Sequence, residues 1–323
     1  MLMPWLAIIG GFVLLMWSAE RFVRGASALA HNLGVSALVI GMVVMGFGTS
    51  LPEMLISGIA AANGNPALGI GNAIGSNIAN MGLVLGITAI IMPLSVASGT
   101  LRREYPILFA AIFLAGVLLG DGDLSRLDGI ILFGGFFLTM GWMIWVGMNG
   151  CKSDEDPLVA ELKTEIPSTM STGTAVMWGV LGLTILVISS RLLVWGAVAV
   201  AHSLGVSDLA IGLSVVAIGT SLPELAASVM SALKGEDDMA VGNVLGSNMF
   251  NLLAVLALPG LIMPGKLDAV VMQRDFPIMV GFTIALFAMA YGFRGPGRIN
   301  RFEGGLLLLG FVAYMIWLGS GLV

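Results

Sequence analysis

An octapeptide that occurs twice constrains this chain more than any other feature of its sequence. Residues 46–53 read GFGTSLPE and residues 217–224 read AIGTSLPE, so six of the eight positions are identical. A second pair, GNAIGSNIAN at 71–80 and GNVLGSNMFN at 242–251, has the same separation of 171 residues. Further matches at this offset extend the similarity over most of the chain. The sequence therefore predicts one structural unit that is used twice.

Both motifs lie in segments that are long and apolar enough to cross a membrane. Of the 323 residues, 58% are hydrophobic and only 10% are charged, whereas globular proteins carry about 25% charged residues. A helix of about 20 apolar residues spans the hydrocarbon core. Ten segments fit this length: 4–20, 37–62, 67–94, 105–120, 127–149, 174–194, 208–233, 239–263, 276–293 and 302–321. We therefore predict an all-α polytopic membrane protein with ten transmembrane helices, in which Gly, Pro and polar residues interrupt the helices that carry the motifs.

Five of these segments lie on each side of a polar connection. We expect a single membrane domain over 1–323, with repeat one at 1–149, a cytoplasmic linker at 150–172 and repeat two at 173–323. Because five is an odd number, the second repeat must enter the membrane from the side opposite to the first. The prediction is thus a pair of inverted-topology five-helix repeats, a plan that many secondary transporters share.

Loop charges predict the orientation of this arrangement. If the N-terminus is outside, ten Lys and Arg residues fall in inner loops and four in outer loops. Positively charged residues are enriched in cytoplasmic loops. In this count Arg21 and Arg24 lie in the first inner loop and Arg191 lies in an outer loop. We therefore expect both termini to be outside.

Each octapeptide places a carboxylate and two hydroxyls on one face of a helix. Thr49 and Ser50 precede Glu53 by four and three residues, which is the spacing of neighbours on a helix surface. Pro52 has no N–H, so the carbonyl of Gly48 loses its helical partner, and in hydrocarbon a bound cation is one replacement. The second repeat supplies the same set: Thr220, Ser221 and Glu224.

The second motif adds a polar stripe to the helix that follows. Its residues step by four along one face: Asn72, Ser76 and Asn80 in the first repeat, and Asn243, Ser247 and Asn251 in the second. Helix packing or support of the site accounts for four of the amides: Asn72, Asn77, Asn243 and Asn248. Packing does not account for Glu53 and Glu224, because a charged side chain inside a membrane costs several kcal/mol.

The candidate ligands in these motifs are all oxygen atoms. The chain has one cysteine, and its two histidines lie outside the motifs, which argues against a zinc or copper site. Ca²⁺ takes six to eight oxygens and uses bidentate carboxylates well, so two glutamates would supply four ligands. Na⁺ would use smaller sets of hydroxyl and carbonyl oxygens. The net charge of −5 and the absence of a basic stripe argue against nucleic acid as a partner.

The paired motifs, Gly-Thr-Ser-Leu-Pro-Glu and Gly-Ser-Asn-Xaa-Xaa-Asn, resemble the α-repeats of the sodium/calcium exchanger branch of the cation/calcium exchanger superfamily. The short loops look like those of compact prokaryotic members, so the resemblance implies a prokaryotic inner or plasma membrane. It also implies that Glu53 and Glu224 bind Ca²⁺, helped by carbonyls near Thr49 and Thr220.

The same resemblance implies further ligands around this centre. Flanking Na⁺ sites would be formed by four serines and two backbone carbonyls: Ser50, Ser76, Ser221 and Ser247, with the carbonyls of Gly46 and Ala217. Asn80 and Asn251 would complete the centre. Some members carry aspartate at the position of Asn251, which leaves this chain with two central carboxylates rather than three. The driving ion and the stoichiometry therefore stay open at this point.

The predicted function is secondary antiport of Ca²⁺ against Na⁺ by alternating access, with no resident cofactor and no enzymatic activity. An empty site with two carboxylates is costly to occlude, whereas Ca²⁺ or two or more Na⁺ neutralise it. The first alternative is H⁺-coupled Ca²⁺ exchange in the same fold, since protons also relieve the repulsion between two glutamates. A cation channel would need a continuous pore. A hydrolase would use Ser50 beside Glu53, but the duplication of this pair favours symmetric binding.

Overall fold

The computed structural model describes residues 2–33, 46–96, 99–149, 170–290 and 297–320, and these residues are helical apart from four short strands. The elements up to residue 149 are α1 Leu2–Asn32, α3 Gly46–Ala62, α4 Pro66–Ala79, the π-helix η2 Asn80–Val84, α5 Leu85–Ile91, β1 Leu94–Val96, α6 Gly99–Leu118, β2 Asp123–Leu124 and α7 Arg126–Asn149. The later elements are α9 Thr172–Leu204, α10 Asp208–Ile211, η3 Gly212–Val216, α11 Ala217–Thr220, α12 Leu222–Lys234, α13 Asp237–Phe250, η4 Asn251–Val255, α14 Ala257–Ile262, β3 Gly265–Lys266, η5 Val271–Asp275, α15 Phe276–Ala290, β4 Gly297–Ile299 and α16 Arg301–Ser320.

Most of the predicted membrane segments are present as helices of spanning length. Within the described residues, eight helices are long and apolar enough to cross a membrane: Leu2–Asn32, Pro66–Ile91, Arg126–Trp145, Thr172–Leu204, Asp208–Lys234, Asp237–Ile262, Val271–Ala290 and Arg301–Ser320. The segment expected at 105–120 forms a shorter apolar helix, Glu104–Leu118. The segment expected at 37–62 begins among residues outside the described ranges, and α3 is its described part. Most of the expected linker, residues 150–169, also lies outside them.

The first and sixth predicted segments are longer than expected. Helix α1 continues to Asn32 rather than ending near residue 20, and α9 continues to Leu204 rather than ending near residue 194. The placement of Arg21, Arg24 and Arg191 in loops was therefore wrong, because all three lie within these two helices. The extra turns are retained because their small residues are buried where α1 and α9 pack together.

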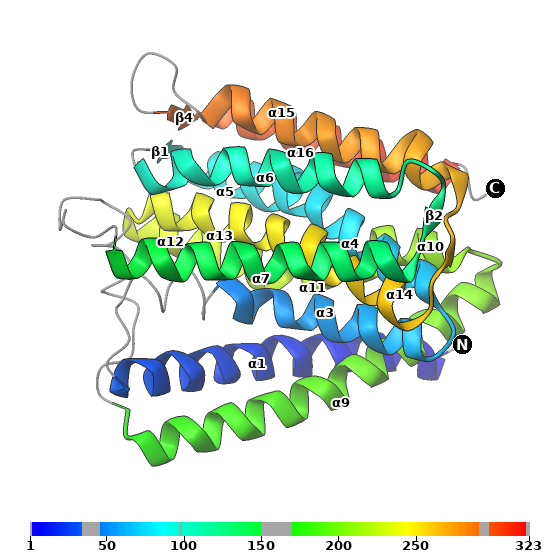
Figure 1. The fold of residues 1–323 in the computed structure, drawn as a ribbon, viewed down its shortest axis with the longest axis horizontal. Helices are drawn as coiled ribbons and strands as arrows, with labels where there is room; N and C mark the ends of the chain where they lie inside the picture. The colour runs from blue at the N-terminus through cyan, green and yellow to red at the C-terminus, as the bar shows by residue number, and fades with distance from the viewer. Residues whose placement is uncertain (1, 34–45, 97–98, 150–169, 291–296, 321–323) are drawn as a thin grey trace.

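Helices α1 and α9 approach each other closely through glycines at equivalent positions of the two repeats. The four glycines are Gly11 and Gly25 in α1, and Gly182 and Gly196 in α9, each pair separated by the 171-residue offset. A Cβ atom at any of them would lie within 3.1 Å of the other helix. Close packing through small residues is typical of helix pairs in membranes. The two helices form a layer along one long edge of the molecule (Figure 1).

Two short antiparallel sheets connect the repeats at opposite ends of the molecule. Strand β1 pairs with β4 through Leu94 and Ile299, and β2 pairs with β3 through Leu124 and Gly265. β1 corresponds to β3 in the repeat, and β2 corresponds to β4. Each sheet therefore joins a strand of one repeat to the non-equivalent strand of the other, and Figure 1 places the sheets at the two ends of the helices.

The buried apolar side chains form two clusters. The larger one lies among α4, α6, α7, α13 and α15 and includes Ile74, Tyr105 and Phe250. The smaller one joins α1 and α9 to α3 and α4, with Leu15 and Ile56 among its members. The helices that carry the two sequence motifs lie between the α1–α9 layer and α15 and α16 on the opposite edge (Figure 1). The motifs are therefore enclosed by protein on both sides.

Candidate cation site

The two motif glutamates are completely buried in the middle of the helix bundle. Glu53 lies in α3 and Glu224 in the first turn of α12, and both side chains are 0% exposed. The two carboxylates are close enough for their charges to repel each other. The sequence motifs thus bring together two acids that are 171 residues apart in the chain.

The motif helices differ at the proline. Helix α3 runs through Pro52 without interruption from Gly46 to Ala62. In the second repeat the helix breaks at Ser221, whose φ of −82° and ψ of 0° separate α11 from α12, and Pro223 lies in the first turn of α12. Proline fits the first turn of a helix, because its missing N–H has no helical partner there. The predicted interruption is therefore present in the second repeat.

Ser247 connects the Glu224 carboxylate to the first repeat. Its hydroxyl donates to Glu224 Oε1 at 3.2 Å. The same oxygen accepts a hydrogen bond from the Ser50 hydroxyl at 3.1 Å and from the Asn80 amide at 3.2 Å. The Asn80 amide also donates to Asn248 Oδ1 at 3.1 Å. Four helices, α3, α4 with η2, α12 and α13, thus meet at one buried polar network.

A second network surrounds Thr220 on the side of the first repeat. Its hydroxyl donates to Asn72 Oδ1 at 3.2 Å and lies 3.3 Å from the Ser76 hydroxyl. The Asn72 amide donates to the backbone carbonyl of Glu53 at 3.2 Å. Asn72 was interpreted from the sequence as a packing or supporting residue, and here it connects Thr220 to the helix that carries Glu53.

The threonines are exchanged between the repeats. The Thr220 side chain interacts with Glu53, and the Thr49 side chain interacts with Glu224. Each glutamate is therefore approached by the threonine of the other repeat rather than by the one in its own octapeptide. The site is shared between the repeats.

Several oxygen atoms in this region have no hydrogen-bond donor. Among the described residues, the buried oxygens without a partner of good geometry include Glu53 Oε1 and Oε2, Glu224 Oε2, Asn80 Oδ1, Asn251 Oδ1 and Ser221 Oγ. Buried polar groups are normally paired, and each exception requires an explanation. Six unpaired oxygens, three of them from carboxylates, form a set suited to a hard cation.

A π-helix begins at each of the two motif asparagines. Asn80 is the first residue of η2, and Asn251 is the first residue of η4. The Leu256 N–H donates to the carbonyl of Asn251 five residues earlier, at 2.9 Å. Single π-turns inside α-helices are frequent at functional sites. The sequence did not predict these turns, although both begin at the last residue of the repeated motif.

The two backbone positions expected to contribute carbonyls lie at helix starts. Gly46 is the first residue of α3, and Ala217 is the first residue of α11. The Ala217 carbonyl accepts from the Ser221 N–H at 3.1 Å and from the Thr220 hydroxyl at 3.3 Å. It lies beside the Thr220 network and is already engaged in it.

Helix α1 contacts both motif helices, which the sequence analysis did not predict. A Cβ atom on Gly48 would overlap Val23, and one on Gly219 would overlap the ring of Phe12. Each glycine immediately precedes the threonine of its octapeptide. These contacts place Trp17, which lies midway between Phe12 and Val23 in α1, at the level of the site.

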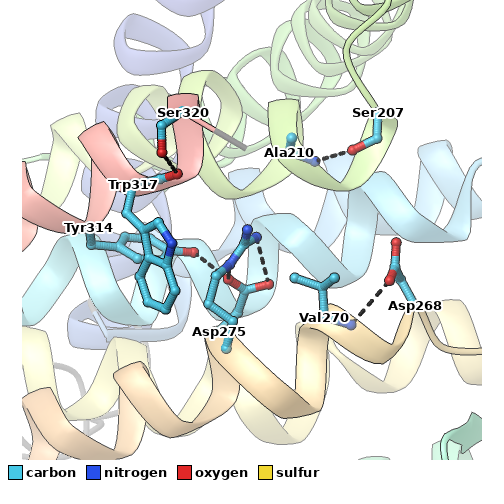
Figure 2. Close-up of polar contacts among 9 residues, drawn as sticks. Ser207, Ala210, Asp268, Val270, Asp275, Tyr314, Trp317 and Ser320 are labelled. Carbon is cyan, nitrogen blue, oxygen red and sulfur yellow. Dashed lines mark hydrogen bonds and ion pairs between the residues drawn. The ribbon is translucent and has the colours of Figure 1, made fainter. Parts of the chain in front are cut away.

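The other buried acids are compensated or lie near helix starts. Asp275 is 0% exposed, but Arg274 Nε lies 2.7 Å from its Oδ1, and the Tyr314 hydroxyl donates to the same atom at 2.9 Å (Figure 2). Asp128, in the first turn of α7, accepts from the Ser125 N–H at 2.8 Å. Glu53 differs from these acids, because neither of its oxygens has such a donor.

The described residues contain no group of three or more His, Cys, Asp or Glu side chains that could hold a metal ion. The centre therefore has two carboxylates and a surrounding shell of neutral oxygens. Such a shell can replace the hydration of Ca²⁺ or Na⁺, and its charge of −2 favours cations over neutral solutes. Nothing in this arrangement provides an activated nucleophile, and its duplicated geometry suits reversible binding.

Comparison with known proteins agrees with this geometry. The profile of the sodium/calcium exchanger protein family matches residues 3–145 and 174–319. A putative antiporter, CaxA of Alkalimonas amylolytica, is 46% identical over 320 residues, which cover 99% of this chain and 100% of CaxA. The inner membrane protein YrbG of Escherichia coli is 39% identical over 100% of both chains.

A solved structure is also similar along the whole chain. The sodium-calcium exchanger NCX_Mj, soaked with 100 mM Na⁺ and 10 mM Sr²⁺, superposes with a TM-score of 0.69 and 32% identity, covering 98% of each chain. The all-helical polytopic fold is thus that of an integral membrane transporter. Together with the family profile and the near-complete coverage of the relatives, this similarity shows that the chain belongs to the sodium/calcium exchanger protein family.

Proposed function

We propose that this antiporter exchanges Ca²⁺ for Na⁺ through the site between Glu53 and Glu224. One observation carries the proposal. Two fully buried carboxylates come from equivalent positions of the repeats, and three of their four oxygens have no hydrogen-bond donor among the described residues. Protein donors are directed at structural acids such as Asp275, whereas these oxygens are left for an ion. The similarity to NCX_Mj, which was soaked with Na⁺ and Ca²⁺ or Sr²⁺, supports the same choice of ions.

The proposed Ca²⁺ position lies between the two carboxylates, with backbone carbonyls near Thr49 and Thr220 completing the shell. Na⁺ ions would flank it and use hydroxyls of the serines that surround the centre: Ser50, Ser76, Ser221 and Ser247. The carbonyls of Gly46 and Ala217 would contribute to the same flanking sites. Asn80 and Asn251 would close the centre through their unpaired amide oxygens.

The proposed architecture is ten transmembrane helices in two inverted five-helix repeats. The exchanged strand pairs at opposite ends of the molecule and the equivalent glycines of α1 and α9 support it. Both termini lie at the same end in Figure 1, as an even number of spans requires. We propose that this end faces the exterior of a prokaryotic inner or plasma membrane. A reporter fused after Val323 should be active outside, and cytoplasmic activity in a transporting fusion would overturn this orientation.

Exchange follows from the charge of the site. An empty pair of carboxylates is costly to enclose, whereas a site holding Ca²⁺ or two or more Na⁺ is neutral or nearly so. Only loaded states would then pass between inward-facing and outward-facing forms, and this coupling links the two ion gradients. The test is Ca²⁺ uptake into proteoliposomes with and without an imposed Na⁺ gradient at fixed pH. Uptake should require the Na⁺ gradient.

Coupling to H⁺ is the second candidate, because the two carboxylates repel each other and protons would also neutralise them. Equal Ca²⁺ uptake with and without Na⁺, together with dependence on a pH gradient, would select this candidate. A channel would instead give Ca²⁺ flux that does not saturate and needs no counter-ion on the other side.

A further inference from the structure

The α1–α9 pair carries charged side chains at a depth where hydrocarbon is expected. Trp17 lies at the level of the cation site, because α1 contacts the two motif helices at Phe12 and Val23. Arg21 follows Trp17 by four residues and Arg24 by seven, so they lie about 6 Å and 10 Å further along the helix axis. The hydrocarbon half-thickness is about 15 Å. If the site is at the membrane midplane, as the proposed function requires, both arginines lie below the usual headgroup level.

Arg21 has aromatic neighbours and no acidic partner. Its guanidinium carbon lies 5.8 Å from the ring centroid of Trp17 and 4.9 Å from that of Trp178 in α9. The two indole rings meet edge to face at 6.1 Å. Within the described part of the chain, its Nε atom is buried and accepts no pairing with an acceptor, and no salt bridge joins it to an acid. A cation held in place at this depth therefore lacks its counter-ion.

The neighbouring pair does not supply that counter-ion. Glu20 Oε1 lies 3.0 Å from Arg24 Nη2, so its charge is already matched, and both side chains are about half exposed. The three charged side chains leave this face with a net charge of +1, and Arg191 adds a further exposed positive charge in the outer half of α9. A second copy of the chain would bring the same excess positive charge to the contact. The charge therefore favours an anionic partner.

We propose that the inner half of the α1–α9 pair binds the headgroup of an anionic phospholipid, with its phosphate on Arg21 and its glycerol region against Trp17 and Trp178. Guanidinium binds phosphate through paired hydrogen bonds, and tryptophan accommodates the boundary between polar and apolar lipid regions. The bilayer would be thinned locally along this face. The lipid would be held beside the layer that contacts both halves of the cation site.

Direct lipid binding to the purified full-length protein tests this proposal without reference to transport. Thermal stability and native mass spectra are recorded with added phosphatidylglycerol, phosphatidylethanolamine or soluble glycerol phosphate. Phosphatidylglycerol should raise the unfolding temperature most and remain bound in the spectra. Arg21→Gln should weaken its binding at least about tenfold, the loss expected for one charge-assisted hydrogen bond. Arg21→Lys should keep part of it, because the charge remains.

Arg191→Gln is the matched control, since it removes an exposed arginine from the other half of the pair and should leave the lipid effect intact. Glu53→Gln should also retain the lipid effect while losing transport, which separates this proposal from the proposed function. Equal binding by the parent and Arg21→Gln would overturn the proposal. So would an equal effect of soluble glycerol phosphate, or lipid-independent self-association that Arg21→Gln abolishes.

Discussion

Glu53 and Glu224 occupy the same place in two copies of one motif, yet their surroundings differ. Ser247 donates to Glu224 Oε1, and Ser50 and Asn80 hold that serine in turn. Among the described residues, neither oxygen of Glu53 has a donor of good geometry. The first repeat therefore contributes donors to the Glu224 side, while the Glu53 side is left with unpaired oxygens.

The asparagines show the same difference. The Asn80 amide nitrogen makes two hydrogen bonds, whereas neither polar atom of the Asn251 side chain has a partner within the described residues. A duplicated sequence need not give duplicated hydrogen bonding, because the repeats pack against different neighbours. We infer that the Glu224 half of the site is pre-organised and that the Glu53 half relies on the ion for its ligand geometry.

The largest expected effect is the loss of transport on neutralising either glutamate. Glu53→Gln and Glu224→Gln should each reduce Ca²⁺ flux by about 100-fold or more, since leaving one buried charge uncompensated typically costs about 3–5 kcal/mol. The measurement is initial Ca²⁺ uptake by purified variants in proteoliposomes, with monodispersity as the control for folding. Near-parental flux in either variant would remove the glutamate pair from the mechanism.

The two asparagines should differ in their contribution to stability. Asn80→Ala removes two hydrogen bonds and leaves Asn248 Oδ1 buried without that donor, so it should destabilise the protein by about 1–3 kcal/mol. Asn251→Ala removes a side chain with no such bonds and should cost about 1 kcal/mol or less. Thermal unfolding in the absence of Ca²⁺ and Na⁺ measures both. Equal losses would contradict the asymmetry described above.

Ion-free stability should distinguish the two glutamates as well. Glu53→Gln removes the acid that has no donor and relieves its repulsion with Glu224, so it should raise the unfolding temperature in ion-free buffer by about 2–4 °C. Glu224→Gln relieves the same repulsion but disturbs the bond from Ser247, and it should give a smaller increase. A larger increase for Glu224→Gln would reverse the assignment of the pre-organised half.

The sequence predicted the residues that gather at this site because their spacing is local. Hydroxyls three and four residues before a glutamate share a helix face in either repeat, and the offset of 171 residues shows which segments are equivalent. The exchange of Thr49 and Thr220 between the glutamates could not be predicted, since it depends on how the two repeats pack. The π-turns at Asn80 and Asn251 likewise depend on tertiary packing rather than on local preference.

The helix boundaries of α1 and α9 were missed for a related reason. Charged residues after an apolar run usually mark the end of a span, and Arg21, Arg24 and Arg191 were interpreted in that way. The structure retains these residues within helices because glycines such as Gly25 and Gly196 let α1 and α9 pack closely beyond the apolar runs. Loop-charge counting therefore loses three of its members, and the proposed orientation depends on the reporter experiment.

The smallest effect that we predict concerns Asn251, where some members of the family carry aspartate. Asn251→Asp would add a third carboxylate next to oxygens that already lack donors. Like charges in a poorly solvated site are relieved by protons or by additional cations. At low pH the added group is protonated and the variant should resemble the parent. At higher pH it should bind Na⁺ more tightly, with a change of about threefold in the half-saturating Na⁺ concentration, equivalent to ~0.7 kcal/mol.

The measurement is initial Ca²⁺ flux over a pH series at several Na⁺ concentrations, for the parent, Asn251→Asp and Asn251→Ala. The alanine variant is the matched control, because it removes a neutral oxygen and adds no charge, so it should weaken Ca²⁺ binding slightly without changing the pH profile. A steeper dependence on pH and Na⁺ in the aspartate variant alone would place residue 251 beside the ions. If both dependences are unchanged, Asn251 does not face the ions, and the unpaired amide belongs to helix packing at the start of η4 rather than to the Glu53 half of the site.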